Sequence, residues 1–261
     1  MVGRVEFTWE SAAESHAGKV RAANEDSILN RRDIHLWAVA DGMGGHLAGA
    51  EASRLVVEAL GSTLPSGDIH DFSRQVKEAL ELANRSLVNK GLEEGKGISG
   101  STVAIFFSIE NKASVVWVGD SRVYRYRRGE LSQISRDHNQ MEEWIAQGLI
   151  DRKDARKHSP SNIITRAIGA DERLEPDEKV LDVEPSDTYL ICSDGLYNEV
   201  SDEELTRLLT TGHCAFAAKQ LIELALAREA RDNVSVVVVH ARCEDDAETR
   251  TRINPRVAVD Q

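Results

Sequence analysis

Four aspartates stand where apolar segments of the chain begin or end. Each lies beside one such segment: Asp41 after 36–40, Asp120 after 115–119, Asp194 after 189–193, and Asp232 before 234–239. A single aspartate of this kind is typical of a turn or a helix cap. Four of them, with the pair Glu25–Asp26 in another loop, favour one shared site, because strand ends can meet at one rim of a sheet.

The chemistry of such a site follows from its ligand atoms. Several carboxylates held close together repel one another and cannot all ionise cheaply without a cation. The ligands here are hard oxygens, with no cysteine or histidine cluster beside them, and this set favours Mg²⁺ or Mn²⁺ over zinc or copper. Two such ions, bridged by a carboxylate at roughly 3.5–4 Å, activate a water and polarise a phosphoryl group. The side chains therefore predict metal-assisted hydrolysis of a phosphoester.

The rest of the chain must supply the strands and helices that hold these carboxylates. Apolar runs predict strands at 5–9, 34–40, 102–109, 113–118, 122–126, 130–134, 179–183, 188–192 and 234–240. Apolar residues at helical spacing predict helices at 47–64, 72–92, 202–209 and 215–230. The short connectors 110–112 and 128–129 predict that the strands between 102 and 134 are antiparallel neighbours. Strands in runs and helices in pairs predict an α+β layered domain.

Two polar segments interrupt or follow this pattern. The segment 137–170 is irregular, with short amphipathic pieces, and indicates either a flap over the site or a surface insertion. The segment 244–261 is a polar C-terminal tail. We therefore expect a single domain over 1–243, with the flap inside it.

The composition limits the partners of this domain. With 261 residues, 41% hydrophobic and 29% charged, the chain is an ordinary globular protein. Its 44 acidic against 32 basic residues give a net charge of −12, which opposes binding to nucleic acid. No apolar run is long enough to span a membrane, and the first ten residues carry no secretory signal. Three widely spaced cysteines suit a reducing cytoplasm, where we expect the protein as a monomer.

Six short segments carry a resemblance to a known family. They are 21–26 (RAANED), 41–46 (DGMGGH), 100–102 (GST), 119–124 (GDSRVY), 193–195 (SDG) and 232–233 (DN), in the order typical of type 2C protein phosphatases. The chain thus resembles the metal-dependent protein serine/threonine phosphatases, the PPM family, and its bacterial branch in particular. The resemblance implies a four-layer α-β-β-α sandwich, two antiparallel sheets flanked by helix pairs, with a flap insertion. It also implies hydrolysis of phosphoserine and phosphothreonine in proteins by a metal-activated water at a binuclear Mn²⁺ or Mg²⁺ centre.

The resemblance also implies a ligand set for two tightly bound ions. Asp41 is similar to the carboxylate that bridges both ions, and Gly42 would contribute its backbone carbonyl. Asp194 and Asp232 resemble the remaining ligands of the first ion. The acidic pair Glu25–Asp26 would lie around the second ion and hold mostly its water molecules.

Further roles follow from the same resemblance. Arg21 resembles the arginine that clamps the substrate phosphate, which its bidentate guanidinium suits, and a surface salt bridge is the alternative. Asp120 resembles a residue that holds a third, weaker ion together with Asp194, and an ordinary turn is the alternative. Some family members have a histidine two residues after the first aspartate as general acid, where this chain has Met43. Water bound to the third ion is a candidate source of that proton. His46 lies nearby in the sequence, and a structural role suits it at least as well as a catalytic one.

Competing functions have weaker support. The pair His213-Cys214 begins like a cysteine-phosphatase loop, but Gln220 stands where the arginine is needed. A two-metal nuclease would use similar carboxylates, yet the net charge of −12 opposes it. A non-catalytic phosphoprotein-binding module is expected to lack metal ligands, and none of the expected aspartates is missing. The partners that the resemblance implies are phosphorylated proteins, the substrates of a serine/threonine kinase.

Overall fold

The computed structural model describes residues 7–44, 47–94, 99–151, 153 and 163–243. The tail 244–261, His46 and part of the flap therefore lie outside the described residues. The strands are β1 (Phe7–His16), β2 (Asp26–Arg31), β3 (Leu36–Met43), β4 (Gly100–Ser101), β5 (Val103–Ile109), β6 (Lys112–Val118), β7 (Arg122–Arg127), β8 (Glu130–Gln133), β9 (Asp177–Asp182), β10 (Thr188–Cys192) and β11 (Val234–Cys243). The helices are α1 (Leu47–Gly61), α2 (Ile69–Glu94), α3 (Gln140–Ala146), α4 (Asp194–Tyr197), α5 (Asp202–Leu209) and α6 (Cys214–Ala227), with a 3-10 turn η1 (Arg32–Ile34). Within the described ranges, no helix is long and apolar enough to cross a membrane.

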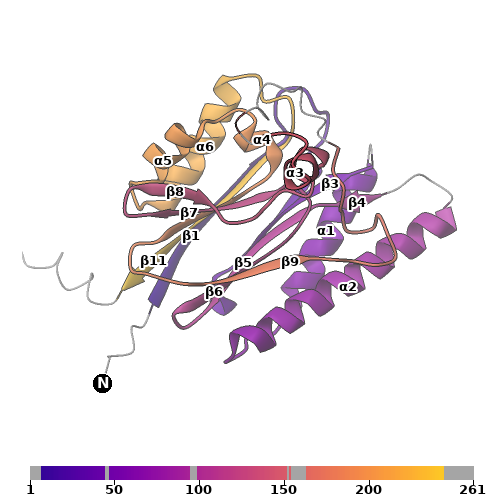
Figure 1. Cartoon of the computed structure of the whole chain (residues 1–261), viewed down its shortest axis with the longest axis horizontal. Helices are drawn as coiled ribbons and strands as arrows, with labels where there is room; N and C mark the ends of the chain where they lie inside the picture. The colour runs from indigo at the N-terminus through magenta and orange to yellow at the C-terminus, as the bar shows by residue number, and fades with distance from the viewer. Residues whose placement is uncertain (1–6, 45–46, 95–98, 152, 154–162, 244–261) are drawn as a thin grey trace, which may run out of the picture.

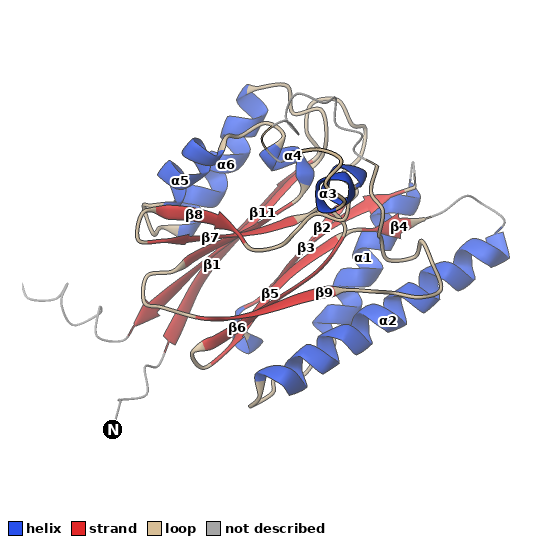
Figure 2. Cartoon of the chain, in the orientation of Figure 1, coloured by secondary structure: helices blue, strands red, loops and turns tan. Residues whose placement is uncertain are grey.

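Two antiparallel sheets form the middle of the molecule (Figure 1). One sheet has the strand order β1-β11-β10-β7-β8. The other has the order β2-β3-β5-β6-β9, with β4 paired to β3. Helices α1 and α2 cover the outer face of the second sheet, while α4, α5 and α6 cover the outer face of the first (Figure 2).

Alternation of side chains along the strands explains the layers. In β3, Leu36, Ala38 and Ala40 belong to the core beneath α1 and α2. Trp37 and Val39 of the same strand face the other sheet. Strand β10 alternates in the same way between the inter-sheet core and the core beneath α4, α5 and α6. Three cores thus separate four layers, and the expected α-β-β-α sandwich is confirmed.

Two details of the strand pattern differ from the sequence expectation. β5 and β6 form one hairpin and β7 and β8 another, but the two hairpins belong to different sheets. The expected run of antiparallel neighbours is therefore partly wrong, because the connector 119–121 crosses between the sheets instead of turning back. The sequence also does not predict β2, an edge strand in which only Asp26 and Leu29 are buried.

The described part of the segment 137–170 is held in place by backbone bridges and a helix cap near its two ends. Asn139 caps α3, since its Oδ1 accepts a hydrogen bond of 2.9 Å from the Glu142 amide. Isolated bridges pair Asn139 with Ile164 and Ser101 with Ile168. No side chain of α3 is buried. The helix therefore stays at the surface while the chain on either side of it is held.

Candidate metal centre

The four aspartates singled out in the sequence converge between the two sheets. Asp41 lies in β3 and Asp120 follows β6, and these two strands run in the same direction because each is antiparallel to β5. Asp194 follows β10 and Asp232 precedes the antiparallel strand β11, so both lie at one edge of the other sheet. The charges of the other three aspartates all act on Asp41. The expected rim of a single sheet is thus wrong in this detail, because each sheet contributes two of the four residues.

Strand β2 brings a fifth carboxylate to the site. Asp26 lies directly opposite Asp41 in the ladder between β2 and β3. Its side chain is buried, and the Ser193 hydroxyl donates a hydrogen bond of 2.8 Å to its Oδ2. Because Ser193 precedes Asp194, this bond ties the two sheets together at the site. The sequence signal for Ser193 is only its place beside the aspartate.

Gly42 and Glu25 meet around a glycine of α1. The Gly42 amide donates a hydrogen bond of 3.2 Å to the Glu25 carbonyl. A Cβ on Gly49 would lie 2.9 Å from both the Gly42 carbonyl oxygen and Glu25 Oε1, and a Cβ on Gly42 would overlap the Gly49 carbonyl. The two glycines therefore let the Gly42 carbonyl and the Glu25 carboxylate approach each other. Gly49 is a residue of the site that the sequence analysis misses.

Asn233 fixes the loop that carries Glu25. Its Nδ2 donates to the carbonyls of Ala17 and Ala23, each at 2.9 Å, and its Oδ1 accepts from the Glu25 amide at 2.8 Å. Asn233 is buried, so these bonds are shielded from water. The motif 232–233 thus combines a carboxylate for the site with an amide that holds a neighbouring loop.

Arg21 contacts the carboxylate cluster directly. Its Nη2 lies 2.6 Å from Asp232 Oδ2 in an ion pair, while 53% of its side chain stays exposed. The hydrogen bond to Asp232 raises the pKa of Arg21, and the charges of Glu25 and Asp41 add to this effect. The salt bridge anticipated as an alternative is therefore present. A half-exposed guanidinium at the edge of the cluster can also bind an anion there, so the phosphate clamp stays a prediction.

Four carboxylates of the cluster share a raised pKa. Burial is the main cause for each, and repulsion from neighbouring carboxylates adds to it. The pKa rises to about 6 for Asp26 and Asp194, to about 7 for Asp120, and well above the usual range for Asp41. Without a cation, the folded protein therefore keeps protons in this cluster that the unfolded chain releases at the same pH.

Three acceptor oxygens of the cluster have no hydrogen-bond donor among the described residues. They are Oε1 of Glu25, Oδ1 of Asp26 and Oδ1 of Asp194, and all three are buried. Buried acceptors are costly unless a positive group meets them. Among the described residues, no group of three or more histidine, cysteine or carboxylate side chains is placed to hold a metal ion, so backbone oxygens and water would have to fill ligand positions. Mg²⁺ and Mn²⁺ accept such mixed shells, and the residues present fit an ion of this kind.

The raised pKa values predict a pH-dependent stability of the chelated protein. The folded state binds more protons than the unfolded chain between about pH 4 and pH 7, so its free energy of unfolding falls as the pH rises through that window. Mn²⁺ replaces these protons, so the melting-temperature gap between Mn²⁺-loaded and chelated protein should widen by about 3 °C or more from about pH 5 to about pH 8. His35 and His138 have lowered pKa values, which make stability rise with pH instead. Their contribution is the same with and without Mn²⁺, so it cancels in the difference between the two melting temperatures. Scanning calorimetry measures it, and an equal gap at both pH values would contradict the prediction.

Comparisons with known proteins place this site in a family. The chain matches the family model described as protein phosphatase 2C over residues 15–230. PstP, a serine/threonine protein phosphatase of Mycobacterium tuberculosis, is 36% identical over 95% of this chain and 48% of its own length. The protein phosphatase PhpP of Streptococcus pneumoniae is 32% identical over 88% of this chain and 96% of its own length. The chain thus spans about half the length of the mycobacterial relative and nearly all of the streptococcal one.

Solved structures share the fold. PppA of Pseudomonas aeruginosa, described as a key regulatory component of T6SS, has a TM-score of 0.85 at 37% identity, over 91% of this chain and 99% of its own. The catalytic domain of PstP, solved in complex with 2 manganese ions, has a TM-score of 0.80 at 35% identity, over 90% of this chain and 99% of its own. With a family model that spans most of its length and bacterial relatives above 30% identity, this chain belongs to the protein phosphatase 2C (PPM) family, as its motifs indicate.

Proposed function

We propose that this chain is a metal-dependent phosphatase that hydrolyses phosphoserine and phosphothreonine in proteins. The observation that carries the proposal is the carboxylate cluster between the sheets, in which buried oxygens of Glu25, Asp26 and Asp194 accept no hydrogen bond from the residues that the structure describes. Such a cluster suits two hard cations, which organise the transfer of a phosphoryl group to water. Further support comes from relatives that are named serine/threonine protein phosphatases.

Two ions, Mn²⁺ or Mg²⁺, would be held by residues of both sheets. Asp41 would be a ligand of both ions, the Gly42 backbone carbonyl would contribute a further oxygen, and Asp194 and Asp232 would complete the first ion. The acidic pair Glu25–Asp26 lies around the second, mostly through water. When bound, the ions supply a water activated for attack and offset the charge of the phosphoryl group. The chain itself keeps the oxygens in place, in part through the ladder that sets β2 against β3.

A third, weaker cation position is part of the proposal. Asp120 is buried, and the charge of Asp194 acts on it. We assign this pair to a third Mn²⁺ or Mg²⁺ that keeps most of its water. The position matters because a serine or threonine oxygen needs a proton as it leaves. Met43 stands where some family members carry a histidine, and its thioether has no proton to give.

Arg21→Ala is expected to raise KM for a phosphothreonine peptide by about 10-fold or more, while Mn²⁺ affinity changes by less than about twofold. The reason is that the guanidinium binds phosphate through its fork, from a half-exposed position at the edge of the cluster. Initial rates give KM, and calorimetry gives the Mn²⁺ affinity. Arg74→Ala is the matched control, because Arg74 forms exposed ion pairs on α2. Weaker Mn²⁺ binding with unchanged KM would instead make Arg21 a structural partner of Asp232.

The partners and the setting of the protein are proposals as well. Phosphorylated proteins are the substrate class, and a serine/threonine kinase would supply them. We propose a cytoplasmic monomer with a signalling role. Three free cysteines, two of them buried, suit the reducing compartment in this proposal. The net charge of −12 opposes nucleic acid as a partner. The domain would span 1–243, with a flap at 137–170 and a polar tail at 244–261.

The substrate class is tested by giving the Mn²⁺-loaded protein a phosphothreonine peptide, p-nitrophenyl phosphate and single-stranded DNA. We expect phosphate release from the first two and no cleavage of the DNA, because the negative net charge repels a polyanion. Binding of the phosphopeptide without phosphate release would favour a binding module and overturn the proposal. Cleavage of the DNA would favour a nuclease.

A further inference from the structure

Asp120 lies in a short loop that is held on both sides. The loop 119–121 joins β6 to β7 and carries the chain from one sheet to the other. Gly119 has a φ of 100°, and a Cβ there would overlap the Thr102 side chain, so glycine is required. The residues that begin the flap contact the chain both before and after Asp120.

His138 holds the residue before Asp120. Its amide donates a hydrogen bond of 2.9 Å to the Gly119 carbonyl. Its ring Nδ1 accepts a hydrogen bond of 3.2 Å from the Gly119 amide. With Nδ1 as acceptor, the ring proton lies on Nε2, which is 3.3 Å from Asp177 Oδ2. The imidazole is buried, so packing fixes its position and with it the position of Gly119.

Asp137 holds Arg122, the second residue after Asp120. Arg122 Nε donates to both Asp137 oxygens at 3.0 and 3.1 Å, and Nη2 donates to Oδ2 at 2.7 Å. Gln133 adds a bond of 3.0 Å to Oδ1. Only 4% of the Asp137 side chain is exposed. A forked ion pair of this kind fixes the orientation of both partners.

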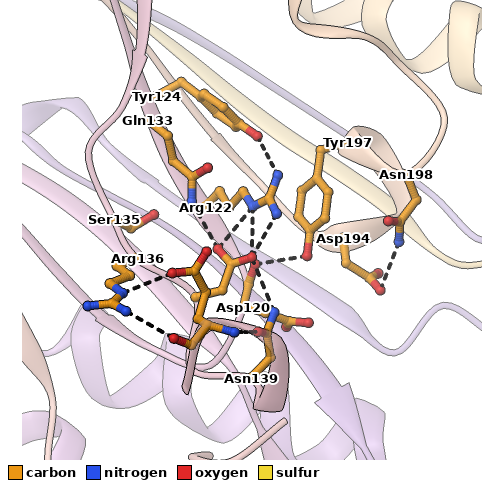
Figure 3. Close-up of polar contacts among 12 residues, drawn as sticks. Asp120, Arg122, Tyr124, Gln133, Ser135, Arg136, Asn139, Asp194, Tyr197 and Asn198 are labelled. Carbon is orange, nitrogen blue, oxygen red and sulfur yellow. Dashed lines mark hydrogen bonds and ion pairs between the residues drawn. The ribbon is translucent and has the colours of Figure 1, made fainter. Parts of the chain in front are cut away.

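The same arginine reaches the helix that begins with Asp194 (Figure 3). The Arg122 guanidinium lies over the Tyr197 ring, 3.5 Å from its centroid, and Nη1 donates to the Tyr124 hydroxyl at 2.9 Å. The Tyr197 hydroxyl donates a bond of 3.1 Å to the Asp120 carbonyl. Tyr197 belongs to α4, whose first residue is Asp194. Arg122 therefore supports both elements that carry the carboxylates of the weak cation position.

Asp137 and His138 are the first two residues of the flap segment 137–170, and together with Asn139 and Thr165 they form what we call the flap base. Asn139, which follows Asp137 and His138, caps α3 and places its Nδ2 3.4 Å from Asp137 Oδ2. The returning chain binds at the same place, because the Thr165 amide donates to the His138 carbonyl at 2.8 Å. A shift of the flap base is therefore transmitted to both sides of the loop that carries Asp120.

We infer that Asp137 and His138 are positioning residues, which set the Asp120 carboxylate against Asp194. They act through Arg122 and Gly119 and touch neither substrate nor cation. The inference rests on the proposed function, because it gives the weak cation position a support from the flap base. It predicts the main effect on that position, because Asp120 belongs to it alone, and a much smaller effect on the two tight ones.

A second forked ion pair in the same fold supplies a matched control. Arg127 Nε and Nη2 donate to the two oxygens of Asp187, each at 2.6 Å, and the Asp187 side chain is 0% exposed. Arg127 lies at the opposite end of β7 from Arg122. Asp187→Asn therefore removes the same kind of buried pair without touching the loop of Asp120.

Calorimetric titration of the chelated protein with Mn²⁺ tests the inference. For Asp137→Asn we expect the dissociation constant of the weak site to rise about 10–100-fold, with the two tight sites unchanged within about twofold. The kcat for a phosphothreonine peptide should fall about tenfold or more at nearly constant KM. For Asp187→Asn we expect all three constants within about twofold of wild type, although its melting temperature falls.

His138→Ala is the second variant, because it removes the acceptor for the Gly119 amide without leaving a buried charge unpaired. The weak site should loosen in it as well, so the inference stays testable if Asp137→Asn does not fold. Unchanged Mn²⁺ constants in the variants that fold would overturn the inference and leave both residues structural. A wild-type protein without a weak Mn²⁺ site would overturn it together with the third cation position. A wild-type protein without phosphatase activity would overturn the proposed function itself, which tells the failures apart.

Discussion

Asp194→Asn is expected to lower turnover of a phosphothreonine peptide by at least about 10³-fold, a rise in the barrier of roughly 4 kcal/mol. Oδ1 of Asp194 is buried and accepts no hydrogen bond within the described part of the chain, and this carboxylate would be a ligand at two cation positions at once. Asparagine keeps the shape of the side chain but loses the charge that holds a cation. Asp41→Asn should act in the same way, since Asp41 would bridge both tight ions. Initial rates at saturating Mn²⁺ measure the effect.

A second readout separates this loss of activity from unfolding. Without metal, each substitution removes a carboxyl group whose ionised form is opposed by burial and neighbouring carboxylates, so the melting temperature of the chelated protein should rise in both variants. Asp33→Asn is the control, because Asp33 forms an exposed ion pair with Arg31 and should keep wild-type turnover. A variant of Asp41 or Asp194 that retains more than about a tenth of wild-type turnover would contradict the assignment.

Asp120→Ala is expected to lower phosphopeptide turnover by about 10²–10⁴-fold, the usual range of general acid catalysis, and p-nitrophenyl phosphate turnover by far less. In the proposal, Asp120 supports the proton supply to the leaving oxygen. A serine or threonine alkoxide is a poor leaving group that needs this proton, whereas p-nitrophenolate leaves without it. Because Asp120 is buried and repelled by Asp194 and Asp137, its removal relieves repulsion and the protein should stay folded.

The ratio of the two losses is the quantity to measure for Asp120. Both substrates are assayed on one preparation, and calorimetry counts the tight Mn²⁺ sites, which should remain two. Ser121→Ala is the control for damage to the loop, since Ser121 is buried there and its hydroxyl lies 2.7 Å from that of Thr102. The ratio should stay at the wild-type value in this control. Equal losses on both substrates would remove the leaving-group argument, and a large drop in melting temperature would make Asp120 structural.

Part of the candidate site could be predicted from the sequence because its carboxylates stand at the ends of long apolar strands. Asp41 and Asp194 follow segments whose side chains alternate between two cores, and this burial leaves a local signal. The sequence places Asp26 in a loop, because β2 is weakly apolar and becomes a strand by pairing with β3. Pairing of this kind depends on residues that are distant in the sequence, so no local sequence pattern predicts it.

The roles of the residues that hold the site in place could not be predicted from the sequence, for a similar reason. The connector 119–121 reads as a turn, and nothing in it shows that the chain crosses to the other sheet there. Asp137 and His138 lie far along the chain from the residues that they bind. Gly49 matters only because α1 approaches the Gly42 carbonyl. Each of these roles arises from packing between elements, which follows from the assembled fold.

In the proposed function, a cation organises this carboxylate cluster for the hydrolysis of phosphoproteins. Removal and return of the metal is the decisive experiment. The wild-type protein is treated exhaustively with EDTA, freed of chelator, and assayed for phosphate release from a phosphothreonine peptide before and after Mn²⁺ is added. We predict no turnover in the chelated protein and recovery of turnover with Mn²⁺ or Mg²⁺. Full activity after exhaustive chelation would contradict the account.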